Sequence, residues 1–167
     1  MSISKNIKSG FLKRKRIEAQ KRTILLKRPE LFSKVLLVVN TPDNALNQAA
    51  RTNFPAAEIN TLFIRKEKEN QSLANTYSVH ATDFNLTGNL KSDKLSSLIQ
   101  TEFDLLIDLS KDSELLTYLV RHLKSTLIVG QMNHPNEMLY DLFFEKSGSD
   151  QAFLNVIVTQ LNQLIKK

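Results

Sequence analysis

The fold is decided by residues 103–130, which read FDLLIDLSKDSELLTYLVRHLKSTLIVG. The apolar run at residues 103–109 suits a strand that is buried on both faces of a parallel sheet. Residues 110–113 form a polar break that can cap a helix, and leucines then recur at helical spacing over residues 115–123. Residues 126–130 are apolar, largely β-branched, and end at a glycine. The stretch therefore predicts a βαβ unit with a right-handed crossover.

The rest of the chain repeats this alternation of strands and helices. The further elements that the patterns predict are strands at 35–39, 59–64, 76–81 and 138–144 and helices at 44–53, 94–100 and 153–165. We therefore predict an α/β fold, a three-layer, doubly wound, mostly parallel and Rossmann-like sheet of five to six strands over residues 34–167. Because they are the most continuously apolar runs, residues 35–39 and 103–109 are expected to be neighbouring, parallel central strands.

The first 28 residues differ from the rest of the chain in charge. They hold ten basic residues and one acidic residue, a net charge of +9, whereas the remainder holds 13 basic and 16 acidic residues, a net charge of −3. Good helix formers dominate this segment, so we expect a basic helical arm over residues 1–28, helical from about Lys5 to Lys27 and ended by Pro29. The residues expected to contact phosphates are Lys5, Lys8, Lys13, Arg14, Lys15, Arg16, Lys21, Arg22, Lys27 and Arg28.

This density of basic residues suits a phosphate backbone, because each neutralised phosphate releases counterions. We expect the arm to dock on structured RNA, such as a ribosomal particle, in preference to DNA, since no groove-reading motif is present. The body would then act as a non-catalytic scaffold or protein-binding module. Two alternatives stay open: the arm inserts Ile3, Ile7 and Phe11 into an anionic membrane surface, or it packs these residues on the body.

Polar residues follow the predicted strands at the edge where an open α/β sheet binds ligands. Ligands of such sheets lie beyond the carboxyl ends of the strands, near the point where the strand order reverses. The residues that can face a small polar ligand there are Asn40, Asp108, Ser110 and Gln131. The alternative interpretation is that they are loop and cap residues that any such fold needs.

Several classes of site lack their motifs. The chain has no cysteine, which excludes disulfides, thiolate zinc sites and cysteine nucleophiles. Residues 40–45 contain no glycine, and no Walker-type loop is present, so a conventional phosphate loop is not expected. Asp108, Ser110 and His134 have the types of an acid, a nucleophile and a base, but no nucleophile elbow surrounds them, and the three histidines lack metal-ligand spacing. We therefore expect no cofactor, no metal and no catalytic residue.

Membrane and export signals are not visible either. No apolar run approaches the roughly 20 residues that a membrane-spanning helix needs. The basic N-terminus is not followed by the apolar region of a secretory signal. We therefore expect a cytoplasmic protein.

Two resemblances involve the stretch that decides the fold. Residues 103–130, followed by LYDLFF at 139–144, resemble a family of small uncharacterised bacterial α/β proteins in which a DLLI(D/N)L strand, a helix, a VG strand and a YDL strand follow in this order. Residues 103–109 and 128–130 are also similar, more weakly, to the amino-terminal domain of heptosyltransferase-like glycosyltransferases, and this implies a shared Rossmann-like architecture. The alternative function is therefore a small-molecule-binding or glycosyltransferase-like enzyme domain with its site at the strand ends.

Overall fold

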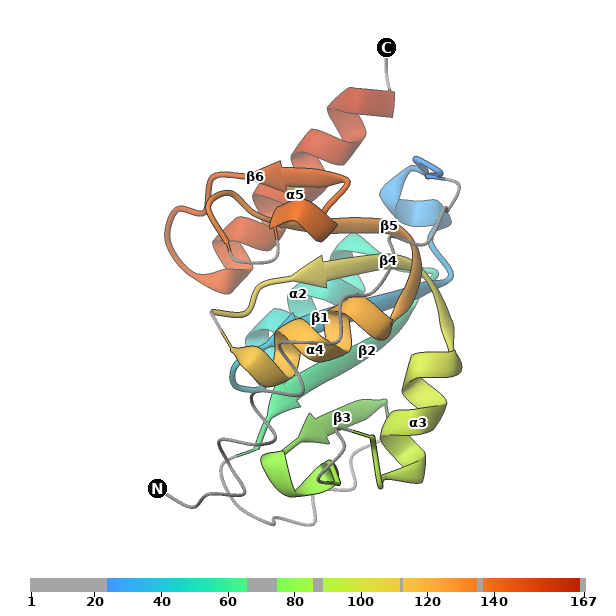
Figure 1. Cartoon of the computed structure of the whole chain (residues 1–167). Helices are drawn as coiled ribbons and strands as arrows, with labels where there is room; N and C mark the ends of the chain where they lie inside the picture. The colour runs from blue at the N-terminus through green and yellow to red at the C-terminus, as the bar shows by residue number, and fades with distance from the viewer. Residues whose placement is uncertain (1–23, 66–74, 86–88, 112, 135–136, 166–167) are drawn as a thin grey trace.

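The computed structural model describes residues 24–65, 75–85, 89–111, 113–134 and 137–165 (Figure 1). Within them, six strands form one parallel sheet in the order β3-β2-β1-β4-β5-β6. The strand order reverses between β1 and β4, which makes that pair the topological switch point. The predicted α/β architecture is confirmed, and every neighbouring pair is parallel. Most of the predicted helical arm, residues 1–23, lies outside the described residues.

The strands of the described residues are β1 (Lys34–Val39), β2 (Glu58–Ile64), β3 (Thr76–Val79), β4 (Glu102–Asp108), β5 (Lys124–Gln131) and β6 (Leu142–Phe144). The α-helices are α2 (Asn44–Asn53), α3 (Asp93–Gln100), α4 (Glu114–His122) and α5 (Asp150–Ile165), and the 3-10 turns are η1 (Pro29–Leu31), η2 (Ala81–Asp83) and η3 (Glu137–Leu139). A polar side chain accepts a backbone N–H bond at the start of each of these four α-helices, namely Asp43 before α2, Ser92 before α3, Ser113 before α4 and Ser149 before α5.

The two central strands pair as predicted. β1 and β4 are parallel neighbours, with Val35 opposite Leu105 and Val38 opposite Asp108. Because successive side chains of a strand point to opposite faces, Leu37 packs in the cluster on one face and Leu36 in the cluster on the other. A central strand covered on both sides therefore needs a continuous apolar run.

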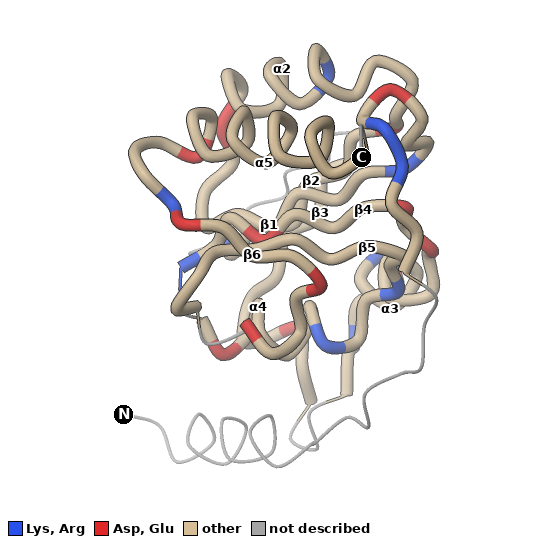
Figure 2. Tube along the Cα trace, turned by 90° about the horizontal axis from the view of Figure 1, so that it is seen from above, with Lys and Arg blue, Asp and Glu red and all other residues tan. Residues whose placement is uncertain are grey.

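Helices cover both faces of the sheet and make the three layers visible in Figure 2. The face covered by α2 and α5 buries residues such as Ala50 and Phe153 against the sheet. The opposite face is covered by α3 and α4, which contribute Leu98 and Leu119. A fully buried leucine or phenylalanine side chain contributes roughly 1.5–3 kcal/mol, so hydrophobic burial on the two faces holds the layers together.

The predicted arm helix does not extend to Lys27. Residues 24–28 contain no helix, and Arg28 is extended, with φ −62° and ψ 147°. The physical reason is the following residue, because a proline disfavours helical geometry in the residue before it. Pro29 and Phe32 are buried, so the packed body begins before β1.

The last predicted strand is shorter than expected. Pairing with β5 is limited to β6, while Met138, which we placed in the strand, lies in η3 and is 98% exposed. Asp141 ends the pairing, because its backbone N–H donates to Ile128 O and its carboxylate accepts from Ile128 N–H at 2.7 Å. The apolar run at residues 138–144 therefore predicted a strand that is too long, because the carboxylate of Asp141 takes the place of a backbone carbonyl in binding β5.

Gly130 in β5 leaves room for the ring of Tyr140. A Cβ on Gly130 would lie 2.1 Å from Tyr140 Cε2, far inside van der Waals contact. Tyr140 is buried in the cluster formed with α3 and α4. Gly130, which ends the predicted βαβ unit, is therefore needed because any larger residue would clash with the ring of Tyr140.

We expect Gly130→Ala to destabilise the protein by about 1–3 kcal/mol, because the new methyl group forces the Tyr140 ring out of its place. Urea denaturation of both proteins measures the difference. In a Tyr140→Ala background the ring that would clash is absent, so Gly130→Ala should be nearly neutral there. An equal cost in both backgrounds would contradict this explanation.

Candidate functional site

The four residues predicted to face a ligand lie together at the carboxyl-end edge of the sheet. Asn40 follows β1, Asp108 ends β4, Ser110 comes two residues later, and Gln131 ends β5. β4 lies between β1 and β5 in the sheet, so the three strands deliver these side chains to neighbouring positions. The sequence-based grouping of these residues is therefore reproduced by the topology.

Asp108 is the centre of a buried hydrogen-bond network. Its Oδ1 accepts from the backbone N–H of Ser110 at 3.1 Å and from the Ser110 hydroxyl at 2.6 Å, and its Oδ2 accepts from the Tyr140 hydroxyl at 2.8 Å. Asp108 is fully buried, and a buried carboxylate is costly unless its oxygens accept hydrogen bonds. In this structure Asp108 therefore holds Ser110 and Tyr140 in position, and protein donors occupy both of its oxygens.

His134 extends the network through Tyr140. The Tyr140 hydroxyl has one proton and donates it to Asp108, so His134 Nδ1, 2.8 Å from that hydroxyl, is the donor of their bond. The Ser110 hydroxyl donates to Asp108 and makes no hydrogen bond to His134. The serine–histidine bond that activates a hydrolase nucleophile is therefore not formed.

Two amide side chains hold the turn that follows β4. Asn40 Oδ1 accepts from the backbone N–H of Lys111 at 2.6 Å, and Gln131 Nε2 donates to the backbone carbonyl of Ser110 at 2.6 Å. The carbonyl and the N–H belong to the same peptide group, so one amide approaches it from the β1 side and the other from the β5 side. The turn is thereby fixed at the topological switch point.

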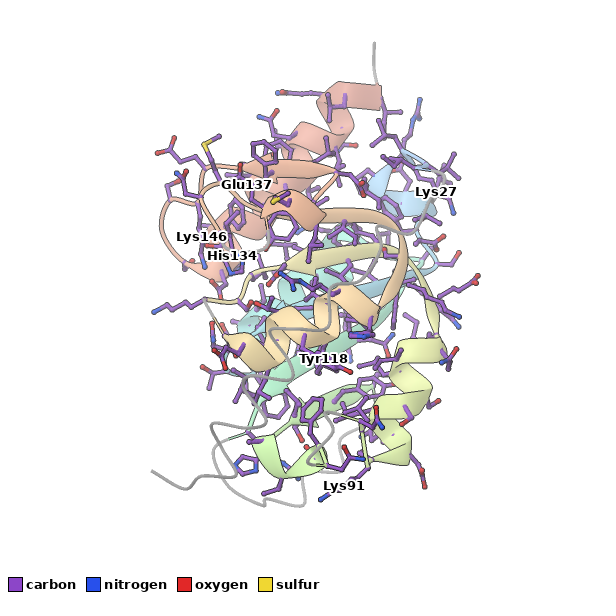
Figure 3. All side chains as sticks on the ribbon, viewed as in Figure 1. Lys27, Lys91, Tyr118, His134, Glu137 and Lys146 are labelled. Carbon is purple, nitrogen blue, oxygen red and sulfur yellow. The ribbon has the colours of Figure 1, made fainter. Side chains whose placement is uncertain are left out.

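The end of the basic segment is anchored at the opposite edge of the sheet. Lys27 Nζ lies 2.7 Å from Asp104 Oδ1, and Asp104 Oδ2 accepts from the backbone N–H groups of Ser33 at 2.7 Å and Lys34 at 3.1 Å. Figure 3 shows Lys27 on the other side of the molecule from His134 and Lys146. Asp104 and Asp108 are four residues apart on β4, which separates the two edges by roughly 13 Å.

The two predicted phosphate-binding residues within the described part have different surroundings. Lys27 is half-buried and paired with Asp104, whereas Arg28 is exposed and its side chain contacts no partner among the described residues. Lys27 therefore anchors the segment, and Arg28 is free to meet an external anion. The other eight predicted residues, from Lys5 to Arg22, lie outside the described residues.

The surroundings of Asp104 lower its pKa. Partial burial alone would raise the pKa, but the hydrogen bond from Lys27, the two backbone N–H donors and the positive charge of Lys27 together outweigh it. The pKa therefore falls below the usual value of 3.8. Asp104 stays charged in the folded protein over a wider pH range than in the unfolded chain.

Among the described residues, no three histidine, aspartate or glutamate side chains come together in a way that could hold a metal ion. No helix in the described part of the chain has the length and apolar character needed to cross a membrane.

Sequence reasoning missed Tyr140 as a member of the network. The residue lies in a stretch that we read as a strand, where an aromatic side chain is unremarkable. The available signal was Gly130, because a glycine in a strand often marks a close approach by another group.

The comparisons with known proteins give a family but no activity. A model of a family of unknown function, DUF6913, matches residues 1–166 of the chain. No curated protein and no solved structure matches it. The expected resemblance to an uncharacterised family is thus confirmed at that level, and no match supports the similarity to heptosyltransferase-like enzymes.

We expect Tyr140→Phe to lower the free energy of unfolding by about 1–3 kcal/mol, because buried Asp108 loses a donor. The control is Tyr77→Phe, since the Tyr77 hydroxyl has no hydrogen-bond partner among the described residues. Urea denaturation compares the two variants. Equal small effects would show that the Tyr140 hydroxyl does not stabilise the network.

We expect the stabilisation from Asp104 to be fully present above about pH 4 and to be lost as the pH falls through its lowered folded-state pKa. Asp104→Asn should cost roughly 1–3 kcal/mol at pH 7 and should lessen the loss of stability between pH 7 and pH 3. Lys27→Gln should cost less, about 0–1 kcal/mol, because the two backbone donors keep their acceptor. Urea denaturation at both pH values measures this, and an identical acid-induced loss in Asp104→Asn and the unmodified protein would contradict it.

Proposed function

We propose that this chain, which belongs to the family of unknown function DUF6913, is a non-catalytic binding module that docks on structured RNA through its basic N-terminal segment. The observation that carries the proposal is the separation of charge along the chain. Residues 1–28 have a net charge of +9 and the remainder has −3. A segment that was only a solvated extension would tolerate more acidic residues than the single Glu18.

The junction between the segment and the body supports this assignment. The Lys27–Asp104 pair and the buried Pro29 fix the point at which the segment meets the sheet. This point lies at the amino-end edge of the sheet, where Asp104 also binds the backbone of Ser33 and Lys34. The body can therefore act as a rigid scaffold to which the segment is firmly attached.

Phosphate contacts suit the composition of the segment. Lysine and arginine neutralise phosphates without reading base sequence, and Phe11 is the only aromatic residue available for stacking. Structured RNA is preferred to DNA because the sequence carries no groove-reading motif.

The alternative proposal is a small-molecule-binding or glycosyltransferase-like enzyme domain. The observation that favours it is the meeting of Asn40, Ser110 and Gln131 at the switch point, where α/β folds bind ligands. RNA binding would use residues 1–28 and ligand binding the residues at the strand ends, so each can be tested with variants that leave the other set of residues intact.

We expect RNA binding to weaken steeply with salt, by about 0.7–0.9 log units of affinity per log unit of salt for each phosphate neutralised. Replacing Lys13, Arg14, Lys15 and Arg16 together by glutamine should lower this slope by about 3. The measurement is fluorescence anisotropy of the full chain with a transfer RNA and with a DNA duplex, at two or more salt concentrations.

The control carries the same change of charge on the body, with glutamine at Lys34, Arg51, Lys91 and Lys124, which leaves residues 1–28 intact. It should keep the salt slope of the unmodified protein. Equal weakening in the two variants, or no RNA binding by the unmodified protein, would overturn the proposal. Tighter binding to anionic vesicles than to RNA would assign the segment to a membrane surface instead.

A further inference from the structure

The peptide group between Ser110 and Lys111 is bound from two sides by amide side chains that each keep an unused hydrogen-bonding group. Asn40 reaches its N–H from the end of β1, and Gln131 reaches its carbonyl from the end of β5, each at 2.6 Å. This peptide lies beyond β4, at the topological switch point. Two separate strands thus place an amide beside one short turn.

Each amide has half of its hydrogen-bonding capacity left. Asn40 accepts through Oδ1, so its Nδ2 keeps two N–H donors, and Gln131 donates through Nε2, so its Oε1 keeps its acceptor sites. Neither remaining atom bonds to another described residue, and both side chains are partly exposed. The turn is therefore flanked by a fixed donor on one side and a fixed acceptor on the other.

Lys111 brings a positive charge to the same turn. Its backbone N–H binds Asn40, while its side chain is exposed and forms no ion pair with a described residue. Lys146, which approaches the same edge through Leu109 O at 3.4 Å, is paired with Asp150. Asp43 caps α2, and Asp108 is buried with both oxygens bonded. Lys111 is therefore the cation with which an incoming anion can pair.

The backbone of this edge limits the size of the anion. Close approach of a pyrophosphate needs glycines after the first strand, and residues 40–45 have none. A single carboxylate needs only a point charge and a side-chain N–H, which Lys111 and Asn40 can offer. Gln131 Oε1 remains an acceptor, so a ligand that also carries a hydroxyl or amino donor can bind it.

We propose that this edge binds a small carboxylate that carries a hydroxyl or amino group. Its carboxylate pairs with Lys111 Nζ and accepts from Asn40 Nδ2, and its hydroxyl or amino group donates to Gln131 Oε1. Asp108, Ser110 and Tyr140 act behind this site by fixing the turn. The inference does not depend on RNA binding, since it uses none of residues 1–28.

The test is isothermal titration calorimetry of the full chain with L-lactate, L-malate and L-glutamine as probes, and with acetate and inorganic phosphate as anions that lack the hydroxyl or amino group on carbon. Two variants remove the recognition while keeping the turn. Asn40→Asp retains the Oδ1 acceptor for the Lys111 N–H but loses the donor, and Lys111→Gln removes the charge but not the backbone. Lys91→Gln is the matched control, because Lys91 is exposed and Figure 3 shows it far from His134.

At least one probe should bind with a Kd below about 1 mM. Asn40→Asp and Lys111→Gln should each weaken that binding about tenfold or more, Lys91→Gln should leave it unchanged, and acetate should bind about tenfold more weakly than the matching hydroxy acid. The proposal is overturned if no probe binds up to about 10 mM. It is also overturned if Asn40→Asp binds like the unmodified protein, which would place the anion on the basic segment, or if phosphate or acetate binds as well as the probes.

Discussion

Burial of the two central strands on both faces is the constraint on which the rest of the structure depends. β1 and β4 are adjacent and parallel, and their side chains alternate between two separate hydrophobic clusters. Neither cluster can form without helices on its own side of the sheet, so α2 and α5 must lie on one face and α3 and α4 on the other. The reversal of strand order between β1 and β4 follows from connections that leave this pair in opposite directions.

That reversal creates the polar edge. The connections after β1 and β4 diverge to opposite sides of the sheet, so the ends of these strands are not covered by a shared loop. At these strand ends, polar groups bind one another through hydrogen bonds. Asp108 binds Ser110 and Tyr140, and the amides of Asn40 and Gln131 bind the peptide group between Ser110 and Lys111. Complete satisfaction around Asp108 gives rigidity. The half-used amides, which are partly exposed, and the exposed Lys111 leave donors, an acceptor and a positive charge available at the same edge.

The two edges of the sheet separate two kinds of chemistry. At the amino-end edge Asp104 gathers Lys27 and two backbone N–H groups, so the basic segment joins the body at a fixed and charge-neutralised point. At the carboxyl-end edge the contacts are hydrogen bonds, which join Asn40 and Gln131 to the turn after β4 and join Ser110 and Tyr140 to Asp108. An ion pair with two backbone hydrogen bonds therefore organises the first edge, and a network of polar side chains organises the second.

The sequence by itself determined the α/β class, the parallel pairing of residues 35–39 with 103–109, the cap of α4 and the grouping of Asn40, Asp108, Ser110 and Gln131 at one edge. These follow from local periodicity, capping chemistry and the rule that parallel strands end at one edge. Only the tertiary structure decided that Tyr140 reaches Asp108, that Lys27 pairs with a residue 77 positions away, and that residues 138–141 leave the strand. Such contacts join side chains from distant segments, and their partners depend on strand order and close packing, which no local pattern encodes.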